Sequence, residues 1–303
     1  MNNQAKILGI TFDTMHTFGA HCRDTAKKCS QRNNALKALA GTDWGSDKET
    51  LLMTYKAVVR SKLEYGAAVI TPTLSESNIE KLQKVQNSAL RTITGCHAMT
   101  HIDHLHQETS VLPVRRHLRM RTIQHHLANH LPDHPGNQLT KEPKNPPRLM
   151  KETLQTRYEE RYIEPLLDSN RPLTEKKYRN LLKTIHTNEV RDALQTYEYP
   201  AVLGHNPPKI AKEETELPRT TRRTLAQLRS GYSKFLNSYM NRIDPTVSEL
   251  CPDCQQTSHT TIHLFDCIAN PTNLTPADLW KQPKKTAIFL KLPTTLDPTT
   301  SDE

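Results

Sequence analysis

The sequence predicts a mainly α-helical protein with very little strand. Apolar residues recur every three or four positions through most of residues 21–131, and two capping-box patterns mark helix starts within that stretch. Only 35% of the residues are apolar and 20 are prolines, which indicates a modest core with irregular connections. A length of 303 residues suggests two domains.

The first element, residues 7–12 (Ile-Leu-Gly-Ile-Thr-Phe), has the β-branched and apolar composition of a short strand. No partner strand lies nearby in the sequence, and a lone strand cannot satisfy its own backbone hydrogen bonds. We therefore expect an orphan strand. It would pair either with a distant element or with a larger fold to which this chain belongs.

Three helices follow on short loops, at about residues 21–40, 46–66 and 77–95. Capping boxes open the second and the third, with Ser46 as the first cap, and a glycine stands where the third helix stops. Short loops between helices of this length predict an antiparallel helical bundle.

Pro113, at a first-turn position, starts a fourth helix that continues to Leu131, with Arg115, Arg116 and Arg119 outside its apolar face. These arginines are candidate phosphate contacts. The same pattern fits a solvated amphipathic face, and the sequence does not separate the two interpretations.

Five prolines between residues 132 and 148 interrupt regular structure and predict a domain boundary. The expected organisation is a strand and helical bundle at 1–131, a Pro-rich linker at 132–148, a poorly defined helical connector at 149–218, a basic helix, metal knuckle and short C-terminal helices at 219–292, and a disordered tail at 293–303.

A strongly basic segment lies between Pro218 and Ile243, where six basic residues occur and no acidic residue does. Its apolar residues recur at helical spacing, so one face packs and the other is cationic. The whole chain has a net charge of +9 and a pI of about 9.2, which favours a polyanionic partner such as RNA or DNA. The candidate contacts in this segment are Arg219, Arg222, Arg223, Arg229 and Lys234. A merely solvated basic face is the alternative.

Near the C-terminus, Cys251, Cys254, His263 and Cys267 have the spacing of a zinc site. The first pair sits on a tight turn, and the second pair lies one helical turn apart on one face. Four protein ligands close the site and leave no position for a reacting water, so we predict a structural Zn²⁺.

Two alternatives to this ligand set are open. His259 competes as the fourth ligand, although it lacks the i, i+4 relation that His263 has to Cys267. Ordinary buried cysteines or a disulfide would also place thiols close together. A zinc-dependent enzyme with a metal-bound water is disfavoured by the closed set of four ligands.

The N-terminus has no apolar signal segment, and no run of residues is apolar enough to span a membrane. Six cysteines are too few for a disulfide scaffold in a chain of this length. We expect a soluble intracellular protein, in the nucleus, the cytoplasm or both.

Several segments carry a further signal by their order along the chain. They are Leu-Gly-Ile-Thr-Phe-Asp at 8–13, Arg-Ser-Lys-Leu-Glu-Tyr-Gly at 60–66, the helical segment at 82–95, Leu-Ala-Gln-Leu-Arg-Ser-Gly at 225–231, the knuckle at 251–267 and Asp-Leu-Trp at 278–280. In this order they resemble the region after the polymerase palm in reverse transcriptases of jockey-like non-LTR (LINE-type) retrotransposons.

This resemblance implies roles for three parts of the chain. Leu8-Gly9 would belong to the primer-grip strand beside the palm, and residues 20–95 would form a thumb-like helical bundle that grips the template–primer duplex. The knuckle would be a C-terminal nucleic-acid-binding module. The partners of the orphan strand would then lie in a palm upstream of this chain.

Polymerisation in that family depends on two metal ions held by a Tyr-x-Asp-Asp box and a further Asp. This sequence contains no adjacent pair of aspartates. We therefore predict a fragment of an RNA-directed DNA polymerase that has no catalytic residues of its own and retains template–primer binding. RNA or DNA and an upstream palm and fingers module are its candidate partners. The alternative is a domesticated, stand-alone zinc-containing protein that binds DNA or RNA.

Overall fold

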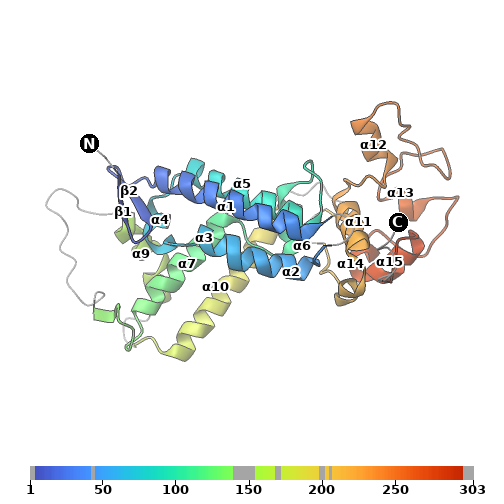
Figure 1. Cartoon of the computed structure of the whole chain (residues 1–303). Helices are drawn as coiled ribbons and strands as arrows, with labels where there is room; N and C mark the ends of the chain where they lie inside the picture. The colour runs from blue at the N-terminus through green and yellow to red at the C-terminus, as the bar shows by residue number, and fades with distance from the viewer. Residues whose placement is uncertain are drawn as a thin grey trace. The chain divides into compact units, whose positions relative to one another are not determined.

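The computed structural model describes residues 4–41, 45–138, 154–167, 172–197, 202–204 and 207–295, and it confirms the mainly α-helical class (Figure 1). The chain divides into two compact units. Unit 1 comprises Met1–Arg32, Ala57–Gln86 and Leu112–Ala193, and unit 2 comprises Asn33–Lys56, Asn87–Val111 and Leu194–Glu303. None of the described helices has the length and hydropathy that a membrane span requires.

A β-hairpin begins unit 1, and the expectation of an orphan strand is wrong. Strands β1 (Gln4–Ile7) and β2 (Ile10–Asp13) pair antiparallel, with Ile7 opposite Ile10. Leu8 and Gly9 form the turn with φ values of 48° and 81°, as in a type I′ turn, whose twist matches that of the paired strands. The segment predicted as one strand therefore contains a turn and parts of two strands.

The N-terminal helices follow the predicted order, with changes at their ends. Helix α1 is Gly19–Ala40, α2 is Lys48–Thr54, a π-helical turn covers Tyr55–Arg60, α3 is Ser61–Leu63, α4 is Ala67–Ile70 and α5 is Glu76–Thr94. The cap of α2 is Asp47, whose carboxylate accepts a hydrogen bond from the backbone N–H of Thr50 at 2.6 Å. The capping box predicted to begin at Ser46 is therefore wrong by one residue. Gly95 follows α5 with a φ of 70°, as a C′ glycine should.

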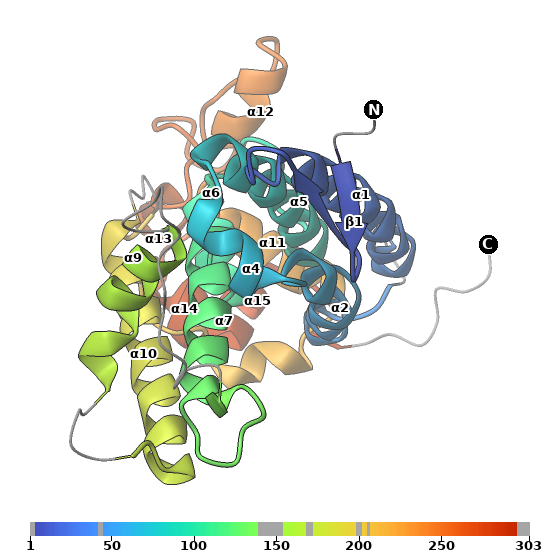
Figure 2. The ribbon, with the colours of Figure 1, turned by 90° about the vertical axis from the view of Figure 1, so that its left-hand side faces the viewer.

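A second group of helices completes unit 1. These are α7 (Val114–Asn129), α9 (Leu154–Tyr162) and the larger part of α10 (Glu175–Thr196), and α10 lies alongside α7 in both views (Figure 1, Figure 2). One apolar cluster joins residues before and after the predicted Pro-rich linker, namely Ile123, Leu127, Leu131, Ile163 and Leu173. Most of the linker itself lies outside the described residues, as does most of the predicted tail.

Unit 2 contains an apolar core formed by its C-terminal helices. Its helices include α2, α6 (Ile102–Thr109), α11 (Arg219–Ser230), α12 (Asn237–Ile243), α13 (His263–Asp266), α14 (Asp278–Lys281) and α15 (Pro283–Phe289), and a 3-10 turn covers Lys212–Glu216. The core residues are Leu217, Leu225, Leu228, Leu236, Tyr239, Leu264, Phe265, Leu279, Trp280, Ala287 and Leu290. The basic helix and the knuckle thus share one core.

Candidate metal centre and basic helix

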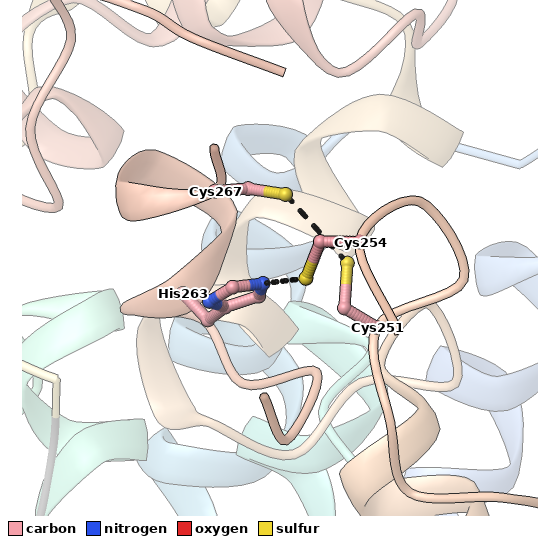
Figure 3. A group of neighbouring side chains, drawn as sticks. All are labelled: Cys251, Cys254, His263 and Cys267. Atoms are coloured by element: carbon pink, nitrogen blue, oxygen red, sulfur yellow. Dashed lines mark hydrogen bonds between the residues drawn. The ribbon is translucent and has the colours of Figure 1, made fainter. Parts of the chain in front are cut away.

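The predicted ligands Cys251, Cys254, His263 and Cys267 converge in unit 2 (Figure 3). One ligand atom from each residue lies within 4.8 Å of the others. The Sγ atoms of Cys251 and Cys267 are 3.8 Å apart, and Cys254 Sγ lies 3.3 Å from His263 Nε2. Within the described part of the chain, this group of side chains could hold a metal ion.

The spacing of the sulfur atoms fits a tetrahedral metal centre. With metal–sulfur bonds of about 2.3 Å, two ligands of a tetrahedron lie about 3.8 Å apart, which is the distance between the Cys251 and Cys267 sulfurs. A disulfide would need about 2.05 Å. All six cysteines are free thiols, so the disulfide alternative does not describe this site.

The first ligand pair lies in a small closed loop. An antiparallel bridge joins Leu250 to Ser258, and the backbone N–H of Cys251 donates to the carbonyl of Thr257 at 2.8 Å. Within the loop, the N–H of Gln255 donates to the carbonyl of Cys251 at 2.9 Å. These bonds bring Cys254 back beside Cys251, as the Cys-Pro-Asp-Cys spacing predicts.

Backbone N–H groups point at both sulfurs of this loop. Hydrogen bonds from the backbone of Gln256 and Thr257 lower the pKa of Cys254 to about 7. Burial raises the pKa of Cys251, while the N–H groups of Cys254 and Asp253 oppose that change. Because the thiolate is the form that binds a metal, the loop stabilises the ligand form of Cys254 before any ion is present.

The single turn of α13 positions the second ligand pair. His263 begins this turn and Cys267 follows it, so the i, i+4 relation predicted from the sequence places both on one face. The turn is anchored by Thr261, whose hydroxyl donates to the carbonyl of Leu228 on α11 at 2.9 Å. Leu264 and Phe265, between the two ligands, enter the core of unit 2.

His259, the competing ligand in the sequence, has a different place in the structure. It is not among the converging side chains, and its Nδ1 accepts a hydrogen bond from the backbone N–H of Asn237 at 3.1 Å. Its own carbonyl accepts from the Ser238 hydroxyl at 2.8 Å. These two hydrogen bonds link His259 in the knuckle to the start of α12.

The basic helix α11 does not present all of its cations to solvent. Arg229 is fully buried, and its guanidinium donates to Glu108 at 3.0 Å, to Glu214 and to the carbonyl of Leu279 at 3.0 Å. Burial alone would lower the pKa of Arg229, but the two carboxylates raise it above its usual value. Arg229 is an internal residue of unit 2 and not the exposed cation that the sequence pattern predicts.

The other arginines of α11 are also engaged. Arg222 is 6% exposed and pairs with Glu49, and Arg219 donates to the carbonyls of Ser46 at 2.8 Å and Thr92 at 3.4 Å. Arg223 is half-buried against Gly95, where an added Cβ would lie 2.6 Å from the arginine Cγ. Lys234, which follows α11, is exposed.

The predicted phosphate contacts of α7 form ion pairs within unit 1. Arg116 and Arg119 both pair with Glu189, and Arg115 pairs with Glu76. The carboxylate of Glu189 is 9% exposed, whereas the Arg115 side chain is 49% exposed. Arg115 is thus the most accessible of these three cations.

The acidic partners of these arginines lie on five separate elements, and no local sequence pattern connects them to α7 or α11. One signal was present on α11 itself. Arg222, Leu225 and Arg229 are spaced by three and four residues and share the face that packs. Helical phase could therefore have assigned Arg222 and Arg229 to the interior.

Two proteins of known class resemble part of this chain. A probable RNA-directed DNA polymerase from transposon BS of Drosophila melanogaster is 30% identical over 128 residues, which cover 42% of this chain. A probable RNA-directed DNA polymerase from transposon X-element of the same organism is 25% identical over 124 residues, or 41% of this chain. The matched stretches span only 13% and 14% of those two proteins.

No protein-family model matches the chain, and no solved structure does. The two polymerases agree with the resemblance inferred from the order of the sequence motifs. The chain therefore contains a region related to the reverse transcriptases of non-LTR transposons.

Proposed function

We propose that this chain is a reverse-transcriptase-derived module that binds RNA or DNA, holds its C-terminal knuckle together with zinc and has no polymerase active site of its own. The observation that carries the proposal is the similarity to two transposon RNA-directed DNA polymerases over about two fifths of the chain. In this proposal the protein acts in the nucleus or the cytoplasm.

Zinc is the metal that best suits the donor set. Three thiolates and one imidazole in tetrahedral spacing favour Zn²⁺ over the hard cations, which prefer oxygen ligands. With Cys251, Cys254, His263 and Cys267 bound, the ion would link the closed loop to α13 and would supply stability rather than chemistry.

Nucleic-acid contact is proposed for the accessible cations of the predicted set. Lys234 is exposed, and both Lys234 and Arg223 lie close enough to His97 to affect its pKa. Burial lowers the pKa of His97, and the positive charges of Lys234 and Arg223 lower it further. Arg115 is the corresponding candidate in unit 1. Arg222 and Arg229 would hold unit 2 together instead of meeting phosphates.

The absence of polymerase chemistry is proposed from the carboxylates. The sequence has no adjacent aspartate pair, and the buried glutamates 108, 189 and 214 are each paired with basic side chains. A two-metal site needs carboxylates that are available to the ions. An upstream palm and fingers module is the proposed partner that would provide them.

A second candidate, a stand-alone DNA- or RNA-binding protein, is favoured by one observation. The N-terminal strands pair with each other, and the hydroxyl of Tyr65 donates to the carbonyl of Leu8 in their turn at 2.6 Å. The hairpin therefore has backbone partners within this chain.

Three measurements on the purified chain test the proposal. We expect one zinc per chain, binding of labelled RNA or DNA that weakens steeply with salt, and no extension of a primed RNA template with magnesium. Extension by the chain alone would overturn the proposed lack of activity. A monomer that folds and binds nucleic acid by itself would favour the stand-alone candidate. A chain that binds neither RNA nor DNA at low salt would exclude both candidates.

A further inference from the structure

A cavity of about 340 Å³ lies beside the metal centre within unit 2. The ligands Cys251 and Cys267 form part of its wall, so the cavity depends on the fold of the knuckle. Leu264 and Phe289, which belong to or pack against the core, provide apolar wall, and Phe235 adds an aromatic ring that is 38% exposed. A volume of this size is at the small end of ligand sites and suits one ring system.

Several polar residues line the cavity besides the two cysteines. Asn237 and His259 are joined by a hydrogen bond from the Asn237 backbone N–H to His259 Nδ1, whereas Asp253 provides a carboxylate, Asn270 an amide and Lys291 an ammonium group, and these last three residues are exposed. A carboxylate and an amide together can both accept and donate hydrogen bonds at the edge of a planar ligand. One cation beside one anion does not make a groove that follows several phosphates.

We propose that this cavity binds a single unstacked base of a single-stranded RNA or DNA. The base stacks on Phe235, its edge meets Asp253 and Asn270, and Lys291 contacts an adjoining phosphate. This inference rests on the proposed nucleic-acid-binding function and names the form of nucleic acid that the knuckle takes.

The combination of groups favours a nucleotide over an apolar protein side chain. An apolar side chain would use the aromatic wall but would gain no interaction with the exposed Asp253, Asn270 and Lys291. A nucleotide has a flat face for the aromatic ring, an edge with donors and acceptors, and one negative charge for the lysine. Lys234, next to Phe235 in the sequence, adds a second cation on the same loop.

The test compares oligonucleotide binding by the full zinc-loaded chain and by variants at Phe235. We expect Phe235→Ala to weaken binding of a short single-stranded oligonucleotide by about tenfold, because stacking on one aromatic ring contributes that order of affinity. Phe235→Trp should retain the affinity. Ile288→Ala, at a side chain that is 60% exposed on α15, is the matched control and should bind like the wild type. Zinc content confirms that each variant is folded.

The same oligonucleotide with abasic positions separates stacking from phosphate contact. It should bind the wild type and Phe235→Ala equally, because it keeps the phosphates and lacks the bases. If the variant binds the normal oligonucleotide as tightly as the wild type does, the base site is overturned while the proposed nucleic-acid binding stands. If the wild type binds no nucleic acid, the proposed function itself fails.

A small-molecule titration followed by NMR distinguishes a nucleotide site from a site for a protein side chain. Signals from residues around Phe235 should shift with a nucleoside monophosphate and should not shift with N-acetyltryptophanamide. Shifts with N-acetyltryptophanamide alone would assign the cavity to a protein partner and overturn the proposal.

Discussion

The knuckle and helix α11 share the core of unit 2, but they are held in different ways. The four candidate metal ligands fall within one short segment, and the Cys251 and Cys267 sulfurs that meet are 16 residues apart in the sequence. Arg229 meets Glu214, which is 15 residues away, but it also meets Glu108, which is 121 residues away, and Arg222 meets Glu49, which is 173 residues away. The knuckle is therefore a local structure that an ion can complete, whereas the charges of α11 are compatible with burial only when distant elements are in place.

The largest effect should come from removing a metal ligand. We expect Cys254→Ala or His263→Ala to abolish binding of zinc and to unfold residues 250–268, because binding of a structural zinc supplies on the order of 10 kcal/mol to small zinc domains. Zinc stoichiometry and the amide NMR signals of the knuckle measure the two effects. The signals of α11 should persist if the two regions are held independently.

His259→Ala is the control for the ligand assignment. It removes the acceptor for the Asn237 N–H and leaves all four converging ligands, so one zinc per chain should still bind. Loss of zinc in this variant, together with retention in His263→Ala, would contradict the assignment.

The next effect concerns the buried arginine of α11. Arg229→Ala removes the guanidinium that pairs with both buried carboxylates, Glu108 and Glu214, and leaves Lys48 as their ion-pair partner among the described residues, so we expect unit 2 to lose about 3–5 kcal/mol of stability. Chemical denaturation of the zinc-loaded chain measures this change. Arg229→Met, with a side chain of similar length, should be about as destabilising because both carboxylates again lose the guanidinium and keep one lysine between them.

A compensating pair of changes separates lost charge from lost packing. Arg229→Met combined with Glu108→Gln and Glu214→Gln removes the uncompensated charges and should recover part of the stability. No recovery in the triple variant would show that packing of the guanidinium over Trp280, at 5.7 Å from the ring centre, matters more than its ion pairs.

The same contrast explains what could be predicted from the sequence. The Cys-Pro-Asp-Cys turn and the helical spacing of His263 and Cys267 are short-range relations, so they predict the ligand cluster and favour His263 over His259 as the fourth ligand. The sequence shows the positive charge of α11, but the burial of its arginines depends on carboxylates such as Glu108 and Glu49, which lie 121 and 173 residues away and which no local pattern connects to the helix. The N-terminal hairpin was missed because Leu8 adopts a positive φ, which its residue type does not suggest.

A smaller, pH-dependent effect links α6 to α11. Burial lowers the pKa of His104 to about 4, and its Nε2 lies 3.0 Å from the carbonyl of Ala226 on α11. In the unfolded chain the ordinary value of about 6.5 applies. Between these values the unfolded state takes up a proton that the folded state does not. The free energy of unfolding should therefore fall as pH decreases from about 6.5 to 4, and the contribution of His104 should be fully present above that window.

His104→Gln isolates this contribution, because an amide can still donate to the Ala226 carbonyl and does not titrate. The slope of unfolding free energy against pH should be shallower in the variant by up to about 1.4 kcal/mol per pH unit within the window. Equal slopes would mean that other groups, such as His106 with its pKa also lowered to about 4 by burial, account for the pH dependence.

The smallest effect should come from the exposed cation that follows α11. Lys234 is accessible where Arg222 and Arg229 are not, so Lys234→Gln should change stability by less than about 0.5 kcal/mol. If it meets one phosphate, the slope of log K against log salt for RNA or DNA binding should fall by about one. Lys209→Gln, at another exposed lysine of unit 2, is the matched control. A reduced slope for Lys234→Gln alone would place the nucleic-acid contact beside Phe235 and its cavity. Equal slopes in both variants and the wild type would move it to Arg115 on α7, whose only described carboxylate partner, Glu76, is itself exposed.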